Sequence, residues 1–460
     1  MIKVTGFENQ KIAILGLGRT GISSALALKS GNVQVFAWDD NVGSRLQAEA
    51  HGVPIFDLTA LEWDQVSALI LSPGIAASHP YAVKAHQAGV PIICDIELLA
   101  CTLKESNFIG ITGTNGKSTT TWLISHLLKA SSHQVEVGGN IGKAALDLQA
   151  LGPNETYVLE LSSYQLERVS TPFLKTAVLL NITPDHLDRH GDMVGYVKAK
   201  EQIFKLQRGP QNVVIGIDDE ECLNLYHKLL QEKTHMVVPI SVKTQVQKGV
   251  YVLDGVLIDD REGKAERILN LKTFHALPGS HNWQNIAAAY ATVCFEEVSK
   301  EQFVKGLQTF QNLPHRLQEV AVIDGVHFIN DSKATNSDAA AKALACYDEN
   351  IFWILGGRVK DNGLDGLEQY FPRIQQAFLI GEAESQFAKL LDGKVSYLRC
   401  HDLSKAVQEA YCKAISCKKR PAYVLLSPAC ASWDQFKDFE HRGEVFKDLV
   451  SRLPRKLNVS

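Results

Sequence analysis

Several features that mark particular classes of protein are missing from this 460-residue sequence. No run of 18 uncharged apolar residues occurs, and no charged segment followed by a long apolar run opens the chain, so we expect neither a membrane span nor export. The nine cysteines include no C-x-x-C pair and no zinc-site spacing, which favours reduced thiols in the cytoplasm. The formal charge is only −4 and no basic patch is present, so we expect no nucleic-acid partner.

What the sequence does contain is an ordinary globular composition repeated in an α/β pattern. Apolar residues make up 45% and charged residues 21%, which excludes disorder for most of the length. At about 150 residues per domain, the length indicates about three domains. Strand and helix patterns recur in three cycles, and we expect domains over residues 1–103, 104–313 and 314–460.

The first third has the pattern of a nucleotide-binding domain. An apolar strand is expected over 12–15, followed by a Gly-rich turn, a helix to Ser30 and a second strand over 33–38. The turn, GLGRTG over 16–21, satisfies G-x-G-x-x-G, and Asp39 follows the second strand as the dinucleotide fingerprint requires. The same geometry suits any diphosphate, so the motif leaves open an NAD site, another diphosphate ligand or a purely structural turn.

The strongest local signal follows the second domain's first strand. We expect that strand over 108–111 and a helix over 117–130, joined by the loop TGTNGKST over 112–119. In such a loop, backbone N–H groups surround phosphate oxygens, Lys117 reaches the β- and γ-phosphates and the Ser118 hydroxyl can bind Mg²⁺. Ile111 stands where the strict P-loop pattern has Gly, so the loop is one step shorter. We predict an ATP site here.

Later parts of the chain complete the α/β pattern. Two short runs about Asp254-Gly255 predict a hairpin over 251–258, which we interpret as a small peripheral β appendage. After Pro314, apolar strands are expected over 326–330, 351–355, 376–380 and 423–426, with a helix over 337–346. The fold expected is therefore α/β in three domains: a Rossmann-like N-terminal domain, a P-loop-type central ATPase domain with the appendage, and a Rossmann-like C-terminal domain.

Three further side chains are candidates for chemistry on weaker grounds. Glu160 ends an expected strand, where a carboxylate beside a phosphate loop is well placed for Mg²⁺. His186 follows the strand expected over 177–181 and could donate a ligand, although a lone His is more often structural. Lys200 lies on an expected helix, where composition alone predicts a solvated face.

Taken together with the dinucleotide-like first domain, six segments resemble the ATP-dependent Mur ligases, so that the resemblance covers all three domains in order. Besides the loop TGTNGKST, they are NITPDHLDRH (181–190) with Lys200 beyond it, GSHNWQN (279–285), LPHR (313–316), NDSKATN (330–336) and LLSPACASWDQF (425–436). The resemblance points to a member that adds D-glutamate to UDP-N-acetylmuramoyl-L-alanine in cytoplasmic peptidoglycan precursor synthesis. It implies ATP-dependent formation of an acyl phosphate, which the amine of D-glutamate then attacks to release phosphate.

The same resemblance implies a role for each matching residue. For the UDP-substrate these are Gly18, Arg19, Thr20, Ser72, Pro73, Gly74 and Asn140. For ATP they are Gly113, Thr114, Asn115, Gly116, Lys117, Ser118, Thr119, Asn282, Asn285, His315, Arg316 and Asp331. For D-glutamate they are Lys333, Thr335, Lys360, Ser432 and Phe439.

The implied catalytic residues are Lys117, Glu160, His186 and Lys200, with two Mg²⁺ ions. One ion is expected on Ser118 and Glu160, and the second near Glu160, His186 and Lys200. A cationic Lys cannot bind Mg²⁺, so the family's solution, carbamylation, is expected at Lys200. The resemblance implies a monomer.

The sequence departs from the family's pattern at three places. Asn41 stands where the family can carry Arg, Gln318 where Glu is common, and Val359 replaces the Asp before Lys360. The alternatives are another Mur-family ligase with a different amino acid, a folylpolyglutamate synthetase, an NAD-dependent oxidoreductase, or a non-catalytic nucleotide-responsive scaffold. The oxidoreductase leaves the phosphate loop and the third domain unexplained.

Overall fold

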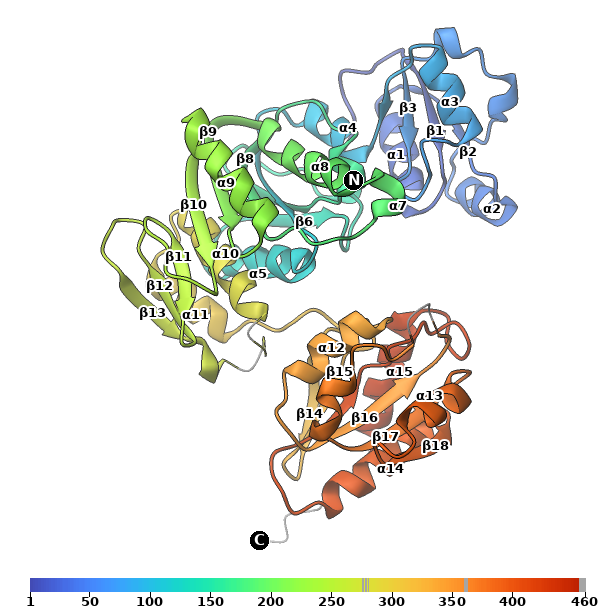
Figure 1. The fold of residues 1–460 in the computed structure, drawn as a ribbon. Helices are drawn as coiled ribbons and strands as arrows, with labels where there is room; N and C mark the ends of the chain where they lie inside the picture. Colours follow the sequence, from blue (N-terminus) through green and yellow to red (C-terminus); the bar gives the residue numbers. More distant parts are fainter. Residues whose placement is uncertain (275–276, 278, 280, 360–362, 455–460) are drawn as a thin grey trace. The chain divides into compact units, whose positions relative to one another are not determined.

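A computed structural model describes residues 1–274, 277, 279, 281–359 and 363–454, with the backbone alone at 210, 273 and 281. Three sheets, each flanked by helices, follow one another along the chain (Figure 1). This is the three-part α/β organisation that the sequence predicts. Within the described residues, no helix has both the length and the apolar character that crossing a bilayer requires.

The N-terminal sheet has the strand order β2-β1-β3-β4, with every pair parallel. Its strands are β1 (Lys11–Leu15), β2 (Gln34–Trp38), β3 (Ala68–Leu71) and β4 (Ile92–Ile93). Its helices are α1 (Arg19–Ser30), α2 (Val42–Ala50), α3 (Pro80–Gln87) and α4 (Asp95–Thr102), with short 3₁₀ turns η1 (Leu58–Ala60) and η2 (Trp63–Gln65). Gly31 caps α1, because its N–H bonds the Leu28 carbonyl at 2.9 Å and the N–H of the next residue, Asn32, bonds the Lys29 carbonyl at 3.2 Å.

The central sheet has the order β13-β12-β11-β10-β9-β8-β5-β7-β6. Its strands are β5 (Asn107–Thr112), β6 (Val135–Gly139), β7 (Thr156–Glu160), β8 (Leu174–Leu179), β9 (Gln207–Gly216), β10 (Met236–Ser241), β11 (Val250–Leu253), β12 (Val256–Asp259) and β13 (Glu266–Asn270). β11 and β12 form the predicted antiparallel hairpin, and β11 also pairs in parallel with β10. The predicted appendage is therefore continuous with the edge of the central sheet.

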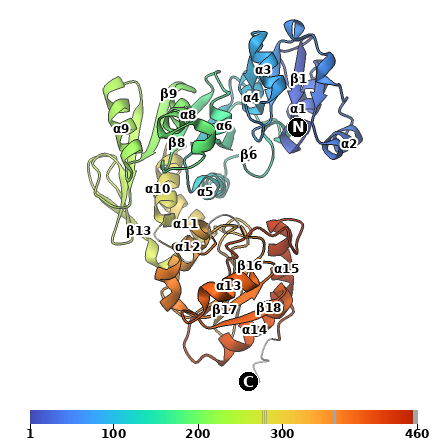
Figure 2. The same cartoon turned by 45° about the vertical axis from the view of Figure 1, so that its right-hand side comes forward.

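Helices cover both faces of the parallel part of this sheet, which explains why β5, β7 and β8 are almost wholly buried. The helices are α5 (Lys117–Ala130), α6 (Ser163–Leu166), α7 (Leu187–His190), α8 (Met193–Lys205), α9 (Glu220–Glu232), α10 (His281–Cys294) and α11 (Lys300–Gln308), with η3 (Ala145–Asp147) and η4 (Leu271–Thr273). Figures 1 and 2 show α5 and α8 on opposite faces of the sheet, so the loop before α5 and the side chains of α8 approach the same strand ends from two sides.

The C-terminal sheet has the order β14-β15-β19-β16-β17-β18 and is parallel except for the β14–β15 hairpin. Its strands are β14 (Gln318–Ile323), β15 (Val326–Asn330), β16 (Ile351–Gly356), β17 (Ile374–Ile380), β18 (Tyr397–His401) and β19 (Ala422–Leu426). Its helices are α12 (Ser337–Ala345), α13 (Glu384–Leu391), α14 (Leu403–Ser416) and α15 (Phe439–Ser451), with η5 (Glu368–Arg373).

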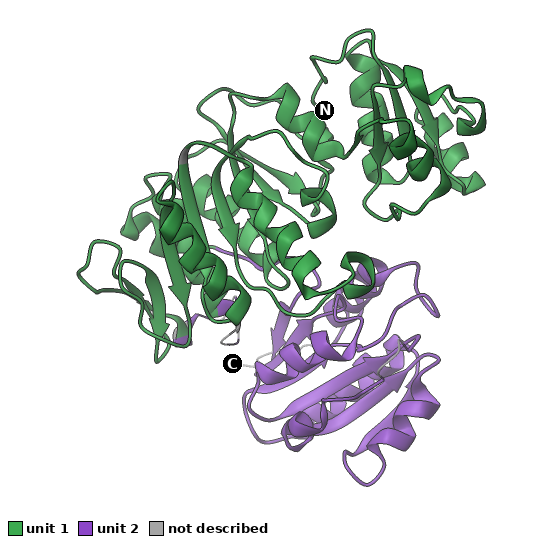
Figure 3. Ribbon diagram, turned by 45° about the horizontal axis from the view of Figure 1, so that its top comes forward, with its two compact units in different colours: residues 1–271, 283–309 green, residues 272–282, 310–460 purple. Residues whose placement is uncertain are grey.

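By contacts, the chain forms two compact units (Figure 3). One contains residues 1–271 and 283–309, and therefore both the N-terminal and the central sheet; the other contains residues 272–282 and 310–460. A single hydrophobic cluster, from Ile2 to Leu229, runs through the first two sheets, whereas the C-terminal sheet has its own clusters on its two faces. The boundaries expected at 103 and 313 stay predictions.

Candidate active site

The loop between β5 and α5 has the backbone shape that its glycines predict. Gly113 and Gly116 have φ of +152° and +83°, and Gly116 directly precedes α5. A Cβ on Gly116 would lie 2.2 Å from Oδ1 of Asn285, so only glycine fits beside that side chain. Asn181 fixes the other side of the loop, because its Oδ1 accepts from the N–H of Asn115 at 2.8 Å and its Nδ2 donates to the Asn115 carbonyl at 3.2 Å.

Two lysines predicted to act in catalysis converge on one atom of this loop. The Nζ groups of Lys117 and Lys200 donate to the carbonyl oxygen of Gly113 at 2.8 and 2.9 Å, and Lys117 also donates to Thr114 at 2.9 Å. Lys200 is only 1% exposed. Burial, reinforced by the neighbouring charge of Lys117, lowers the pKa of Lys200 to about 7. The solvated face expected from composition is therefore wrong, because α8 packs this residue against β5.

Tyr196 holds Lys200 and the loop together, and no sequence motif indicated a role for it. Nζ of Lys200 lies 4.7 Å from the centre of the Tyr196 ring, and the Tyr196 hydroxyl is 3.2 Å from Oγ1 of Thr114. The ring therefore offers a cation–π contact while its hydroxyl bonds the loop. Spacing of four residues on one helix is the sequence signal that could have linked Tyr196 to Lys200.

Glu160 ends β7 beside this loop and is 2% exposed. Its Oε1 accepts from Nδ2 of Asn140 at 2.7 Å, and the Asn140 N–H also bonds the Glu160 carbonyl at 2.9 Å. Its Oε2 is buried without a hydrogen-bond partner. A buried carboxylate oxygen without a partner is costly unless a cation completes it, so this donor fits a divalent metal ion.

The predicted metal ligands are of mixed type. Within the part of the chain that the structure describes, no group of three or more His, Cys, Asp or Glu side chains is arranged to hold a metal. Ser118 lies in the first turn of α5, while Glu160 and the Lys200 amine flank the loop. These residues therefore fit Mg²⁺ in the way that the resemblance implies. The oxygen donors would be the Ser118 hydroxyl, the Glu160 carboxylate and a carbamylated Lys200.

His186 precedes α7 in a left-handed conformation with φ of +54°, which is uncommon for a residue other than glycine. Its ring is about half exposed, lies 5.1 Å from the Tyr164 ring, and has Nε2 3.5 Å from Oδ2 of Asp185. A side chain that is half exposed does not form part of the buried core, so a structural role of His186 in the core is excluded. Its ring stays available for a ligand.

The predicted residues of the N-terminal domain line one cavity of about 510 Å³. It lies at the carboxyl ends of β1, β2 and β3, where open α/β sheets bind ligands. Six of the seven residues predicted for the UDP-substrate are among its lining residues: Gly18, Arg19, Thr20, Ser72, Pro73 and Gly74. Asn140, the seventh, follows β6 and contacts Glu160, and its role with the UDP-substrate stays a prediction. The lining also includes Asp39, Asp40, Asn41 and His79, of which Asp40 and His79 form a 2.9 Å pair that no sequence motif indicated.

Asp39 is engaged with the backbone. Its Oδ2 accepts from the N–H of Leu17 at 2.7 Å and its Oδ1 from the N–H of Asn41 at 2.8 Å. In a dinucleotide site the corresponding carboxylate binds the ribose hydroxyls. Here both oxygens already accept backbone hydrogen bonds, one from the Gly-rich turn and one from the residue that follows β2 by three positions, which disfavours the NAD interpretation.

In the C-terminal unit, several predicted residues meet at the carboxyl ends of β15 and β19. Nζ of Lys333 lies 3.8 Å from the centre of the Phe439 ring. The Lys333 N–H bonds the carbonyl of His315 at 3.1 Å, and Thr335 is bonded in turn to the Lys333 carbonyl at 2.8 Å. Ser432 is buried on the loop after β19.

Two predicted ATP residues of this unit are buried titratable groups. Nδ1 of His315 lies 3.0 Å from Nδ2 of Asn330, and burial lowers the pKa of His315. Asp331 accepts from Oγ of Ser427 at 2.8 Å and from the Leu317 N–H at 3.2 Å, yet burial raises its pKa to about 7.

For the remaining predicted residues, the structure gives mainly their positions on the helices and loops. Asn282 and Asn285 are both buried on the first turns of α10, and Oγ1 of Thr120 lies 3.2 Å from Oδ1 of Asn285. Arg316 follows His315 before β14, and Thr119 is on the first turn of α5. Lys360, predicted for D-glutamate, lies outside the described residues.

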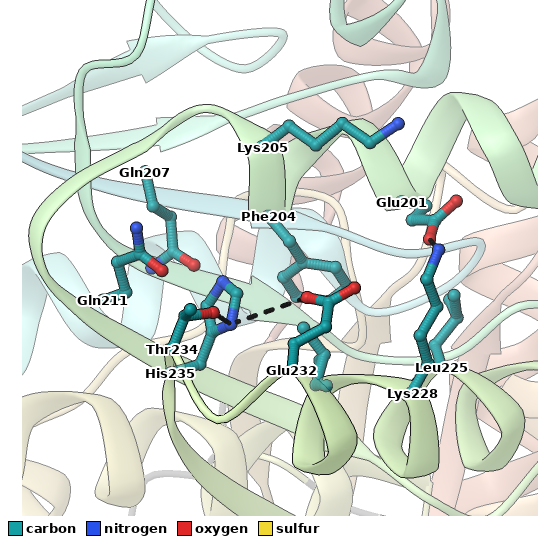
Figure 4. A pocket seen from close by; sticks show the side chains of 11 residues that line it. Glu201, Phe204, Lys205, Gln207, Gln211, Leu225, Lys228, Glu232, Thr234 and His235 are labelled. Atoms are coloured by element: carbon teal, nitrogen blue, oxygen red, sulfur yellow. Dashed lines mark hydrogen bonds and ion pairs between the residues drawn. The ribbon is translucent and has the colours of Figure 1, made fainter.

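A cavity of about 250 Å³ that no sequence pattern indicated lies between α8, α9 and β9 (Figure 4). Phe204, Leu225 and Leu229 form its apolar wall, and a Glu201–Lys228 ion pair lies at its edge. None of the residues predicted for ATP, the UDP-substrate or D-glutamate lines it.

The sequence matches three described domain families in order. These are the Mur ligase MurD-like N-terminal domain over residues 10–94, the Mur ligase middle domain over 111–293 and the Mur ligase glutamate ligase domain over 315–430. Among curated proteins, the UDP-N-acetylmuramoylalanine--D-glutamate ligase of Rhodospirillum rubrum is 48% identical, covering 98% of this chain and 97% of its own. The protein of the same name from Caulobacter vibrioides is 46% identical, with 98% of each chain covered.

Solved structures with the same fold are more distant in sequence. The UDP-N-acetylmuramate-alanine ligase of Thermotoga maritima aligns with a TM-score of 0.59 at 19% identity, over 96% of this chain and 99% of its own. A UDP-N-acetylmuramoyl-L-alanyl-D-glutamate--2,6-diaminopimelate ligase aligns with a TM-score of 0.56 at 18% identity, over 86% and 95%. With three domain matches in sequence order and relatives alike along 98% of its length, the chain belongs to the Mur ligase family.

Proposed function

We propose that this chain is the ligase that adds D-glutamate to UDP-N-acetylmuramoyl-L-alanine, with ATP hydrolysed to ADP and phosphate. The observation that carries the chemistry is the site around Gly113, where two lysine ammonium groups meet one carbonyl beside a buried, half-satisfied carboxylate. The substrates come from the shared name of the full-length relatives. The reaction makes a peptidoglycan precursor, and we place it in the cytoplasm, where the dispersed cysteines are expected to stay reduced.

A carboxylate is a poor acyl donor because its leaving group would be oxide. In the proposed reaction, a carboxylate oxygen of the L-alanyl group attacks the γ-phosphorus of ATP, and ADP leaves. The amine of D-glutamate then attacks the carbonyl carbon of the acyl phosphate; phosphate departs with the bonding electrons, the nitrogen loses a proton and an amide remains. The first step brings two anions together, so nearby positive charge must offset their repulsion.

Lys117 supplies that charge from the protein. Its Nζ is held at the mouth of the loop by the carbonyls of Gly113 and Thr114, within reach of a phosphate bound to the loop N–H groups. Ser118, Glu160, His186 and Lys200 would hold Mg²⁺, which when bound neutralises phosphate charge. Asn140 orients Glu160 by occupying Oε1, which would leave Oε2 as the oxygen donor to the metal.

Carbamylation of Lys200 is chemically favoured by its surroundings. An amine attacks CO₂ only in its neutral form, and a pKa of about 7 gives Lys200 a large neutral fraction at physiological pH. Attack of the Nζ lone pair on the carbon of CO₂ forms an N–C bond and releases one proton, which leaves a carbamate. The carbamate replaces the ammonium group of Lys200, which lies close to that of Lys117, by an anion with two oxygen donors.

The amino-acid subsite is proposed around Lys333, Thr335, Ser432 and Phe439. D-Glutamate carries two carboxylates, which suit an ammonium group and hydroxyls. The cation–π contact with Phe439 fixes the Lys333 ammonium group at this subsite. The roles of Asn282, Asn285, His315, Arg316 and Asp331 with ATP, and of Lys360 with D-glutamate, stay predictions of the resemblance, as does the monomeric state.

Phosphate release tests the proposal. We expect release only when ATP, Mg²⁺, UDP-N-acetylmuramoyl-L-alanine and D-glutamate are all present. Matched reactions should replace the pair by UDP-N-acetylmuramate with L-alanine, or by the D-glutamyl product with a diamino acid. Faster release with either alternative pair would assign the chain to another ligase of the family, and release independent of any amino acid would refute the ligase mechanism.

A further inference from the structure

A buried arginine of the central domain bonds the backbone of the N-terminal cavity. Arg168 follows α6 and is 8% exposed. Its Nη1 donates to the carbonyls of Leu71 at 3.0 Å and Ser72 at 3.4 Å, and its Nη2 donates to the carbonyl of Ile75 at 3.2 Å. Three carbonyls on five consecutive residues are thus gathered by one guanidinium group.

These carbonyls belong to a loop with little hydrogen bonding of its own. β3 pairs with β4 only as far as Ile70, so the Leu71 carbonyl lies beyond that ladder. Pro73 has no N–H, and within the loop the Ile75 N–H bonds the Ser72 carbonyl at 3.0 Å. Arg168 therefore supplies donors that the loop itself does not provide.

The same loop shapes the cavity proposed for the UDP group. Residues 72–75 line that cavity, and Oγ of Ser72 donates to the Gly16 carbonyl at 2.9 Å, which joins the loop to the Gly-rich turn. A displacement of the loop would therefore move both walls of the diphosphate site.

Charge adds a second reason for a cation at this position. The cavity lining carries Arg19 but also Asp39 and Asp40, so its charged side chains sum to −1 with His79 neutral. A diphosphate is an anion, and the N-terminus of α1 contributes only a partial positive charge. The partners of the Arg168 guanidinium group within the described chain are carbonyls, so its charge is not cancelled by an ion pair.

We propose that Arg168 is a positioning residue for the UDP-substrate, which holds the loop 72–75 in its binding shape and adds a buried positive charge beneath it. This inference rests on the proposed function, because it takes the cavity to be the UDP site. Arg168 lies eight residues after Glu160, at the end of the short segment that links β7 to the loop. The carboxylate proposed for Mg²⁺ and the arginine that bonds the cavity loop therefore lie on one chain segment, which hydrogen bonds join to the cavity.

Direct binding tests the inference on the full chain. We expect Arg168→Met to weaken the affinity for UDP, measured by calorimetry, by about tenfold or more, because charge-assisted hydrogen bonds are lost. Arg168→Lys keeps the positive charge, but a lysine cannot reach three carbonyls. Its affinity for UDP should therefore lie between that of the unsubstituted chain and that of Arg168→Met. The affinity for a non-hydrolysable ATP analogue should change less than twofold in both variants, which also shows that the central domain is folded.

Arg208→Met is the matched control, because Arg208 pairs with Glu105 at 3.3 Å and donates to the Ser106 carbonyl, away from the cavity. In turnover, Arg168→Lys should raise the KM for the UDP-substrate and leave kcat and the KM for ATP within twofold. Unchanged UDP affinity in Arg168→Met, or equal loss of UDP and ATP-analogue affinity, would overturn the inference. An unsubstituted chain that fails to bind UDP would refute the proposed UDP site itself, and the inference with it.

Discussion

Asp331→Asn should change the stability of the C-terminal unit in opposite directions at low and high pH. Asp331 is buried, and among the described residues its carboxylate accepts two hydrogen bonds, from Ser427 and from the Leu317 N–H. Burial outweighs both bonds and raises the pKa to about 7 from an ordinary value of 3.8. The folded state therefore holds a proton that the unfolded chain releases between about pH 4 and pH 7.

The sign and size follow from this difference. Below pH 3.8 the raised pKa of Asp331 does not lower the free energy of unfolding, because the carboxyl is protonated in both states. The loss of stability grows as the pH rises to about 7 and is constant above that pH. At about 1.4 kcal/mol for each pH unit, the full cost is about 4 kcal/mol. Asparagine cannot ionise and escapes that cost, but it weakens the two hydrogen bonds by about 2 kcal/mol. We expect the variant to be more stable by about 2 kcal/mol at pH 8 and less stable by about 1 kcal/mol near pH 4.5, where about 1 kcal/mol of the ionisation cost is already present.

Urea denaturation at a series of pH values measures this difference. Fluorescence follows the transition through Trp353, which is buried in the same sheet, and transition midpoints are compared because a chain of several domains need not unfold in one step. Asp365→Asn removes the same charge from an exposed position and controls for the change in net charge. A midpoint difference between Asp331→Asn and the unsubstituted chain that stays constant from pH 4.5 to pH 8 would refute the reasoning.

Further outcomes are expected at the phosphate loop and the Gly-rich turn. Lys117→Ala should lower phosphate release by at least about a thousandfold with an unchanged circular dichroism spectrum, and retained turnover would favour a scaffold role. Gly116→Ala should weaken ATP-analogue binding by about tenfold or more in calorimetry, since its Cβ would lie 2.2 Å from Asn285; equal affinity would contradict the loop geometry. Gly21→Ala should destabilise the N-terminal sheet by about 2 kcal/mol or more in thermal unfolding, because its Cβ would lie 1.8 Å from the Gly16 carbonyl oxygen. Labelled bicarbonate should give a carbamate ¹³C resonance that Lys200→Ala abolishes, and its persistence in the variant would place the modification elsewhere.

Local sequence patterns predicted the strands and helices around the site, because the predicted site residues lie at the ends of strands. β15 coincides with the expected strand at both ends, and α5 with the expected helix. Each of these elements is bounded by a marked change from apolar to Gly-rich or polar residues, which is what a pattern can detect. β8, in contrast, ends at Leu179 and not at Asn181, because the Asn181 side chain bonds the loop at Asn115.

Long-range contacts set the limits of what the sequence could predict. Burial of Lys200 depends on α8 packing over β5 and the loop at Gly113, which is 87 residues earlier in the chain, and no local feature of that helix indicates this contact. Asp39 satisfied the dinucleotide pattern, yet its oxygens serve the backbone of Leu17 and Asn41. The hairpin pattern predicted β11 and β12 but not their parallel attachment to β10. For Lys200, and for the contact of Asp39 with Leu17, the partner lies beyond the window in which periodicity and spacing are informative.

The unusual energetics of the site follow from the need to bind three anions with a chain of net charge −4. The net charge of the chain does not attract these anions, so positive side chains have to be placed close together at each site. Such like charges repel one another until an anion binds. Lys117 and Lys200 share one carbonyl, and the repulsion between them helps to lower the pKa of Lys200. A phosphate group, or a carbamate on Lys200, relieves that repulsion. Binding and modification should therefore stabilise the central domain, because each supplies the counter-charge that its fold leaves missing.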